Sequence, residues 1–306
     1  MPLLDPDLMR YSIVLTLVAL AGCASAAGRP AATEPNAGFG HLVIVGGGPI
    51  PDTINRRFFE LAGGAGKARI VVLPMASAGG ARSGAEKAAS FARMGAASTV
   101  SMQLTREDAG SDSVARFLGQ ATGIWFPGGD QNRLTAAIIG TAVLDSIRSR
   151  YRRGAVVGGT SAGAAVMSDP MIGGDERRPG GARPDTTDAW MTIDRDDVVL
   201  VPGFGLLPDV TVDQHFLRRR RHNRLISVVL ERPTVVGVGI DESTALVVSP
   251  SGTWEIIGAS QAVVYDARRS TLSPAGTTLG ATDVRLHVLP PGSRFDLASG
   301  QATLPR

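Results

Sequence analysis

Short apolar runs alternate with amphipathic segments along the first half of the chain. The apolar runs are rich in Val and Ile and fall at residues 41–45, 69–74, 98–104, 123–126 and 155–158. The segments between them predict helices at 53–61, 85–94, 113–118 and 134–151. Strands that are apolar throughout are buried on both faces, as parallel strands under helices are. The pattern therefore predicts an α/β fold: a mostly parallel sheet flanked by helices on both faces.

The pattern changes after Ser168. Residues 169–197 are rich in Gly, Pro, Asp and Arg with little periodicity, which predicts a long loop or insertion. Beyond Pro233, four β-branched runs predict a mixed or antiparallel C-terminal edge of the same sheet, at 235–240, 245–248, 253–257 and 261–265. No repeat and no linker divides the chain. We therefore predict a single domain over residues 39–306.

The N-terminal segment has the pattern of an export signal. Apolar and small residues run from Tyr11 to Leu20-Ala21-Gly22-Cys23, like a signal-peptide core followed by a lipobox. The run is short for a bilayer span, so a retained transmembrane helix is the weaker interpretation, and an ordinary buried helix is the other alternative. We predict a lipoprotein-type signal peptide at 1–22, lipidation of Cys23 and a flexible tether at 23–38. The protein would be exported and membrane-anchored, on the periplasmic face or the cell surface.

Composition excludes several classes of protein. Apolar residues make up 43% of the chain and charged residues 19%, which is too apolar for a disordered protein. The net charge is +3 and nearly all basic residues are scattered arginines, so no nucleic-acid partner is predicted. The single cysteine rules out a disulfide framework and a Cys-rich metal site. We predict neither a metal nor a cofactor.

The strongest chemical signal is Gly159-Thr160-Ser161-Ala162-Gly163, which follows a predicted strand directly. A strand, a sharp turn and a helix are the setting of a nucleophile elbow, which presents a serine hydroxyl at the strand end near backbone N–H groups. A glycine-rich turn or phosphate cradle is the competing interpretation. The Walker lysine is missing, however, and glycines at 158, 159 and 163 do not fit G-x-G-x-x-G.

A serine nucleophile needs a base, and the chain has four histidines. His215 follows a β-branched segment and so falls near a strand end, where active-site residues of open α/β sheets gather. His41 and His287 lie in strand-like runs, and His222 lies in an arginine run. The orienting carboxylate is expected from Asp241-Glu242, which ends another apolar run. Each histidine taken alone is more often structural, and an Asp-Glu-Ser turn is commonly solvated.

Four motifs together resemble the cyanophycinase family. They are Phe126-Pro-Gly-Gly-Asp-Gln131, Gly159-Thr-Ser161-Ala-Gly163, Asp213-Gln-His215-Phe-x-x-Arg219-x-Arg221-x-x-Arg224-Leu225 and Gly239-Ile-Asp-Glu242. The resemblance spans about residues 41–265. It implies a class I glutamine-amidotransferase-like fold and a serine peptidase related to the aspartyl dipeptidases. The order serine, histidine, acid differs from α/β-hydrolases, whose acid precedes the histidine.

The resemblance also implies a role for each matching residue. Ser161 would be the nucleophile, His215 the general base and acid, and Glu242 the carboxylate that orients the histidine. The oxyanion would be held by backbone N–H groups of Ala162 and of Gly128 or Gly129. The remaining matches would line the substrate site: Gln131, Asp213, Gln214, Arg219, Arg221 and Arg224.

The implied substrate is cyanophycin, a polyaspartate chain with arginine on each β-carboxyl, which would be cut to β-aspartyl-arginine dipeptides. Arginine forks suit its carboxylates, and Asp213 could pair with a substrate guanidinium. Two alternatives stay open: an exopeptidase for Asp-containing dipeptides, and a non-catalytic lipoprotein that binds anions through its arginines. A solvated basic helix face would also explain the arginine run, and a homodimer stays open.

Overall fold

The structure is a computed structural model that describes residues 39–176, 192–274 and 276–306. Residues 35–306 form one compact unit. The predicted signal peptide, the tether and Cys23 lie outside the described residues. Within the part that is described, no helix is long and apolar enough to cross a membrane.

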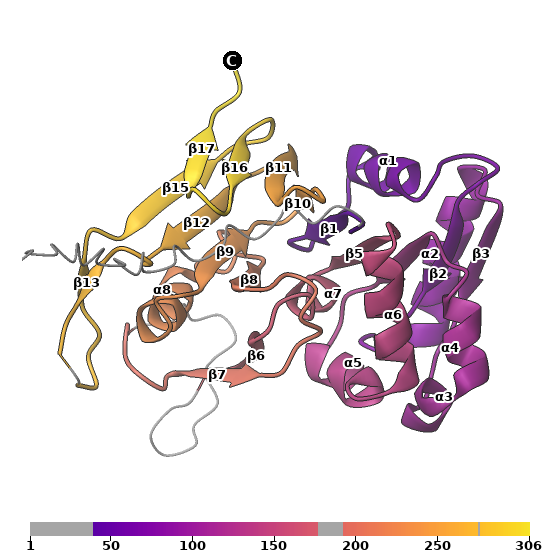
Figure 1. Cartoon of the computed structure of the whole chain (residues 1–306), viewed down its shortest axis with the longest axis horizontal. Coiled ribbons are helices and arrows are strands. Elements are labelled where there is room, and N and C mark those ends of the chain that lie inside the picture. Colours follow the sequence, from indigo (N-terminus) through magenta and orange to yellow (C-terminus); the bar gives the residue numbers. More distant parts are fainter. Residues whose placement is uncertain (1–38, 177–191, 275) are drawn as a thin grey trace, which may run out of the picture. The chain divides into compact units, whose positions relative to one another are not determined.

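Five parallel strands, in the order β1-β5-β4-β2-β3, form one side of a nine-stranded sheet and end at β3 as its edge strand (Figure 1). They are β1 (Leu42–Val45), β2 (Arg69–Val72), β3 (Ser98–Ser101), β4 (Gly123–Phe126) and β5 (Val156–Thr160). Side chains of β1 and β4 are buried on both faces, which explains why their sequences are apolar throughout. The predicted parallel α/β sheet is confirmed.

Helices cover both faces of this sheet. One face packs α1 (Asp52–Leu61) and α2 (Gly80–Arg93) against Val43 and Trp125. The other face packs α5 (Gln131–Ile138) and α6 (Ala142–Arg152) against Ile44 and Ile124. The shorter helices are α3 (Arg106–Gly110), α4 (Asp112–Leu118) and α7 (Ala162–Ala165).

The prediction of a single helix at 134–151 is wrong. Two helices occupy this region, because Gly140 has a left-handed backbone (φ 72°) and Thr141 precedes α6 in an extended conformation. Glycine adopts a left-handed backbone without steric cost and so separates the two helices.

The C-terminal strands divide between two sheets. Antiparallel strands β10 (Thr244–Val248) and β11 (Thr253–Gly258) extend the nine-stranded sheet from β1, followed by β16 (Arg294–Asp296) and β17 (Gln301–Thr303). A separate four-stranded sheet has the order β15-β12-β9-β8. Its strands are β8 (Val210–Gln214), β9 (Val236–Ile240), β12 (Ala262–Asp266) and β15 (Arg285–Leu289).

The expectation of one continuous sheet edge is therefore corrected. Strand β9 pairs in parallel with β8 and antiparallel with β12, so both of its edges are occupied and it cannot also pair with β10. Helix α8 (His222–Glu231) connects β8 to β9 and packs on β9 and β12. A two-stranded sheet joins β13 (Thr271–Leu272) to β14 (Ala281–Thr282).

The segment 169–197, predicted to be a loop, is in part a strand. Strand β6 (Met171–Glu176) lies within it and pairs antiparallel with β7 (Val198–Val201). Met171 and Ile172 are buried, so the apolar start of the segment joins the core. Residues 177–191 lie outside the described part.

The two main sheets meet where β1, β5, β8 and β9 have their carboxyl ends. Val45 of β1 pairs with Thr160 of β5, and Gln214 of β8 pairs with Ile240 of β9. A backbone hydrogen bond from His215 N to Gly46 O, 2.7 Å long, links the two sheets at this edge. Residues that follow β1, β5, β8 and β9 therefore lie close together.

Candidate active site

Ser161 occupies the sharp turn between β5 and α7. Its backbone has φ 53° and ψ −111°, which a non-glycine residue rarely adopts, and its N–H donates to Val45 O over 3.0 Å. The turn requires Gly163, because a Cβ there would lie 2.1 Å from the carbonyl oxygen of Phe126. The strand, turn and helix predicted around the serine are present.

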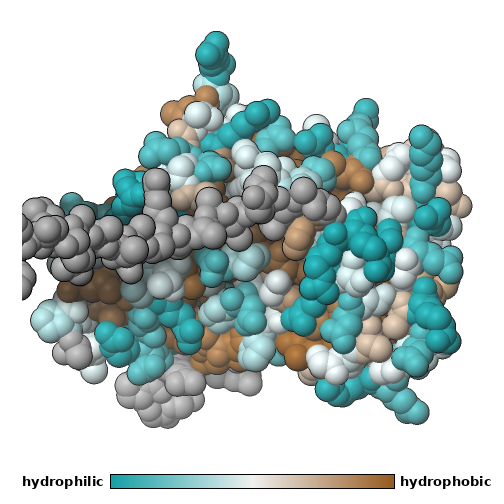
Figure 2. All heavy atoms as spheres, viewed as in Figure 1, coloured by the Kyte–Doolittle hydropathy of each residue, from teal (hydrophilic) through white to brown (hydrophobic). Residues whose placement is uncertain are grey.

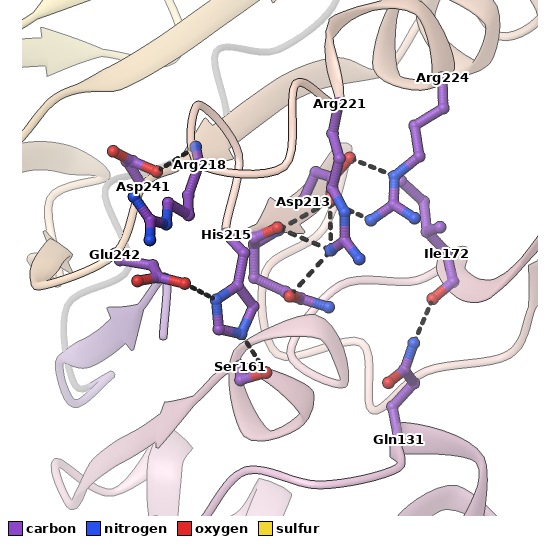
Figure 3. Close-up of polar contacts among 11 residues, drawn as sticks. Gln131, Ser161, Ile172, Asp213, His215, Arg218, Arg221, Arg224, Asp241 and Glu242 are labelled. Atoms are coloured by element: carbon purple, nitrogen blue, oxygen red, sulfur yellow. Dashed lines mark hydrogen bonds and ion pairs between the residues drawn. The ribbon is translucent and has the colours of Figure 1, made fainter. Parts of the chain in front are cut away.

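Three predicted residues form a hydrogen-bonded chain (Figure 3). Ser161 Oγ lies 2.9 Å from Nε2 of His215, and Nδ1 of His215 lies 2.7 Å from Oε1 of Glu242. The imidazole can accept the serine proton at Nε2 while the carboxylate accepts the Nδ1 hydrogen. This arrangement can turn the hydroxyl into a nucleophile.

Sequence reasoning missed the glycine loop Gly46-Gly47-Gly48 after β1, which packs against this chain. A Cβ on Gly47 would lie 2.3 Å from Cε1 of the His215 ring, and a Cβ on Gly48 would lie 2.9 Å from Oε2 of Glu242. Side chains at these positions would displace the His215 ring and the Glu242 carboxylate. Three consecutive glycines at the end of the first predicted strand were the available signal.

The environment of His215 favours the neutral ring. Burial lowers the pKa of His215, and the positive charges of Arg219 and Arg221 lower it further. The hydrogen bond to Glu242 acts in the opposite direction, because it stabilises the protonated ring. The net result is a pKa below the usual value of 6.5, so the ring is ready to accept a proton at neutral pH.

The predicted oxyanion residues lie beside the serine. Ala162 directly follows Ser161 and begins α7, so its N–H has no acceptor within the helix. A Cβ on Gly128 would lie 3.4 Å from Cβ and 3.9 Å from Oγ of Ser161, which places the Gly128 backbone against the hydroxyl. Gly129 instead approaches the backbone of Ala76, where a Cβ would lie 2.1 Å from the carbonyl oxygen. The Cβ position of Gly128 therefore faces Ser161, whereas that of Gly129 faces the backbone of Ala76.

Asp213 and Arg224 pair with each other behind the histidine (Figure 3). Arg224 donates Nε to Asp213 Oδ2 over 2.7 Å and a second N–H to Asp213 Oδ1, and both side chains are almost fully buried. Gln214 N also donates to Asp213 Oδ1. Because both carboxylate oxygens already accept hydrogen bonds, the structure shows Asp213 paired internally, where the sequence suggested a substrate guanidinium.

Arg221 lies between this ion pair and the triad formed by Ser161, His215 and Glu242 (Figure 3). Its guanidinium donates to the carbonyl oxygen of Gln214 over 2.8 Å and to Gln214 Oε1 over 3.0 Å, and it lies 3.6 Å from Asp213 Oδ1. Burial lowers the pKa of Arg221 to about 10, and the charge of Arg224 contributes to the same shift. The Asp213 carboxylate therefore compensates two guanidinium groups at once.

The remaining predicted substrate residues are arranged differently. Arg219 is exposed on the turn that follows His215. Gln131 is buried, and its amide donates to Ile172 O over 3.2 Å, which holds strand β6 against α5. Arg218 N donates to Asp241 Oδ1, so the residue before Glu242 fastens the turn after His215. The structure thus surrounds the triad with residues of the arginine motif but does not point all of them toward one space.

The other histidines do not reach the serine. Nδ1 of His222 lies 2.7 Å from the hydroxyl of Tyr265, His287 packs on Phe295, and His41 precedes β1. Within residues 39–176, 192–274 and 276–306, no cluster of His, Cys, Asp and Glu is arranged to hold a metal ion.

Comparisons with known proteins agree on one family. A sequence profile of peptidase family S51 matches residues 42–256. The cyanophycinase of Trichormus variabilis is 38% identical over 251 residues, which cover 80% of this chain and 80% of that protein. The cyanophycinase of Geminocystis herdmanii is 33% identical over 255 residues, or 81% of this chain and 89% of that protein.

Solved structures show the same fold. The crystal structure of a peptidase from an acI-B1 Actinobacterium superimposes with a TM-score of 0.58 at 22% sequence identity. The match covers 79% of this chain and 96% of the other. The α/β architecture is therefore that of a known peptidase.

Proposed function

The chain belongs to peptidase family S51 and is a serine peptidase, and from this we propose that it hydrolyses cyanophycin to β-aspartyl-arginine dipeptides through Ser161, His215 and Glu242. The observation that supports the mechanism is the hydrogen-bonded chain from Ser161 Oγ through His215 to Glu242, with separations of 2.9 and 2.7 Å. The support for the substrate is the similarity to two cyanophycinases over four fifths of the chain.

In the proposed first step, Ser161 Oγ attacks a backbone carbonyl carbon of the polyaspartate chain. His215 Nε2 takes the hydroxyl proton, and the carbonyl oxygen becomes an oxyanion that accepts hydrogen bonds from the N–H groups of Ala162 and Gly128. The C–N bond then breaks, and His215 returns its proton to the leaving amine. A water molecule repeats the sequence on the acyl ester and releases the dipeptide and free Ser161.

Charge complementarity supports the choice of substrate. Each cyanophycin unit presents a free carboxylate, and Arg219 is exposed beside His215 with Arg221 behind it. A guanidinium binds a carboxylate through two parallel hydrogen bonds. The buried Asp213–Arg224 pair fixes the carboxyl end of β8. Gln214, the last residue of that strand, accepts a hydrogen bond from Arg221 and so holds its guanidinium in place. We assign Arg219 and Arg221 to substrate carboxylates, and Asp213 and Arg224 to positioning.

Digestion of cyanophycin tests the proposal. The purified protein is incubated with the polymer and, separately, with free Asp-containing dipeptides, and the products are identified by mass. We expect β-aspartyl-arginine from the polymer and little cleavage of the dipeptides. Cleavage of the dipeptides alone would replace the proposal by the aspartyl dipeptidase alternative. No cleavage of either substrate would contradict the proposed substrate.

The pH dependence of kcat/KM should reflect the protonation of the His215 ring. Only the neutral ring accepts the Ser161 proton, so kcat/KM should fall on the acid side with a midpoint below 6.5, because the pKa of His215 is lowered in the fold. Glu242→Gln removes the carboxylate that raises this pKa, so the midpoint should move to still lower pH while the maximum rate falls. Rate profiles over about pH 4 to 9 measure both. A midpoint above 6.5, or an upward move in Glu242→Gln, would contradict the assignment.

We also propose that the protein is exported and anchored by acylation of Cys23. The support is the apolar run that ends in Leu20-Ala21-Gly22-Cys23. The mass of the N-terminal peptide from the membrane-bound protein tests this, because an unprocessed N-terminus with a free Cys23 thiol would contradict it.

A further inference from the structure

The end of the parallel sheet opposite the triad is strongly basic. Segments 61–69, 93–98, 118–123 and 150–156 lead into the amino ends of β2, β3, β4 and β5, whereas Ser161 follows the carboxyl end of β5. These four segments contain no Asp or Glu and six basic residues: Lys67, Arg69, Arg93, Arg150, Arg152 and Arg153. We call this group the basic end.

Members of the basic end lie close together and are accessible. Arg69 Nε donates to Gln120 O and Arg150 Nε donates to Ala121 O, both over 2.9 Å, so two guanidinium groups are held along the start of β4. Burial lowers the pKa of Arg150, and the positive charges of Arg153 and Arg69 lower it further. Arg152 and Arg153 are exposed, and their side chains make no hydrogen bond or ion pair with the described residues. Figure 2 shows hydrophilic residues over the region of α6 and β5.

The chain leaves the fold at this same end. Gly40 N donates to Tyr151 O over 2.7 Å, and the ring of Phe39 contacts the ring of Tyr151 edge-on at 5.3 Å. Cys23 precedes Phe39 by 16 residues. Sixteen residues span at most about 55 Å when fully extended. A lipid on Cys23 would therefore keep Phe39 and Tyr151 within that distance of the membrane surface.

A cavity of about 440 Å³ with both apolar and basic lining residues opens beside Arg152 of the basic end. Its walls combine Phe39, Tyr151, Leu206 and Trp254 with the guanidinium groups of Arg148 and Arg152, and no acidic residue lines it. Asp112 lines a neighbouring hollow together with Arg116 and Arg153, where one acid meets two cations. Cationic side chains next to apolar surface are typical of proteins that bind anionic lipid headgroups.

We propose that the basic end docks on a surface of anionic lipid headgroups. The docked protein presents Ser161 and its partners to the opposite side, where a polymer can approach. The orientation rests on the proposed anchor at Cys23, but the affinity for anionic lipid is a property of the folded unit and is independent of the catalytic proposal.

Vesicle binding tests this surface with the processed chain, residues 23–306, which contains the whole compact unit. Cys23→Ser prevents acylation, so that only the protein surface binds. Cosedimentation compares neutral phosphatidylcholine vesicles with vesicles of about one third phosphatidylglycerol. Binding to the anionic vesicles should be about tenfold stronger and should weaken as salt is added.

Two double variants with the same charge change locate the surface. Arg152→Glu/Arg153→Glu should reduce binding to the level seen with neutral vesicles. Arg82→Glu/Arg133→Glu changes exposed residues at the starts of α2 and α5, at the catalytic end, and should bind anionic vesicles like the parent. An unfolding midpoint of Arg152→Glu/Arg153→Glu equal to that of the parent would show that this variant is folded.

Three outcomes would overturn the proposal. Equal binding of the parent to both kinds of vesicle would show that the surface does not select anionic lipid. Equal loss of binding in both double variants would show that binding depends on the net charge of the protein and not on the basic end. Equally tight binding to duplex DNA with the same salt dependence would indicate a general polyanion surface. None of these outcomes bears on the proposed peptidase activity.

Discussion

Ser161→Ala is expected to abolish cyanophycin hydrolysis, with a loss in kcat on the order of 10⁴ or more. The substitution removes the oxygen that lies 2.9 Å from His215 Nε2, so no acyl ester can form at this position. Product release measured by mass over long incubations checks the residual rate. The unfolding midpoint should remain close to the parent's, because Ser161 Oγ does not cap α7 and the change removes a single atom.

Ser146→Ala is the matched control. Ser146 Oγ donates to Ala115 O over 2.7 Å on α6, so this variant also loses one serine hydrogen bond but lies away from the triad. It should keep the parent rate. The double variant Ser161→Ala/His215→Ala should be no slower than Ser161→Ala, because residues that act as one unit are not additive. Hydrolysis by Ser161→Ala at the parent rate would refute the proposed nucleophile.

Arg224→Ala should cause the largest loss of stability among substitutions in the arginine motif. It leaves the Asp213 carboxylate buried with one backbone hydrogen bond, from Gln214 N, and with the more distant Arg221 guanidinium 3.6 Å away as its remaining positive partner in the pair described above. Breaking a buried ion pair from one side costs about 3–5 kcal/mol in the free energy of unfolding. Urea unfolding monitored by tryptophan fluorescence measures the change.

Arg219→Ala supplies the comparison for stability. Arg219 is exposed, so its loss should change the unfolding free energy by less than about 0.5 kcal/mol. Arg224→Lys should recover only part of the stability, since an ammonium cannot make both hydrogen bonds to Asp213. Equal stability of Arg224→Ala and Arg219→Ala would show that the buried pair contributes nothing to the fold.

The sequence predicts the parallel core because its strands follow a local rule. Leu42–Val45 and Gly123–Phe126 are buried on both faces, and that environment produces the apolar runs visible in the sequence. The division into two sheets follows from pairings between distant segments. Leu42 pairs with Val248, more than 200 residues away, and no local pattern specifies that partner.

The candidate site likewise has a part that the sequence predicts and a part that only the structure shows. Ser161, His215 and Glu242 each follow a strand, so strand ends and the motifs of the resembling family predict them as candidates. The Asp213–Arg224 pair depends on how the chain turns between β8 and α8, where Arg220 has a left-handed backbone (φ 51°). The order of residues does not show that Asp213 and Arg224 pair with each other and not with a ligand.

If Ser161, His215 and Glu242 act as proposed, their order along the chain bears on when the enzyme becomes active during synthesis. Strands β2 to β5 and the turn that bears Ser161 are complete before the base at 215 and the carboxylate at 242 have been added. Strand β1 also awaits β10, which is its neighbour in the sheet but lies some 200 residues later. Contacts of such long sequence separation form late in folding. An unfinished chain would therefore carry the proposed nucleophile without the two residues proposed to activate it.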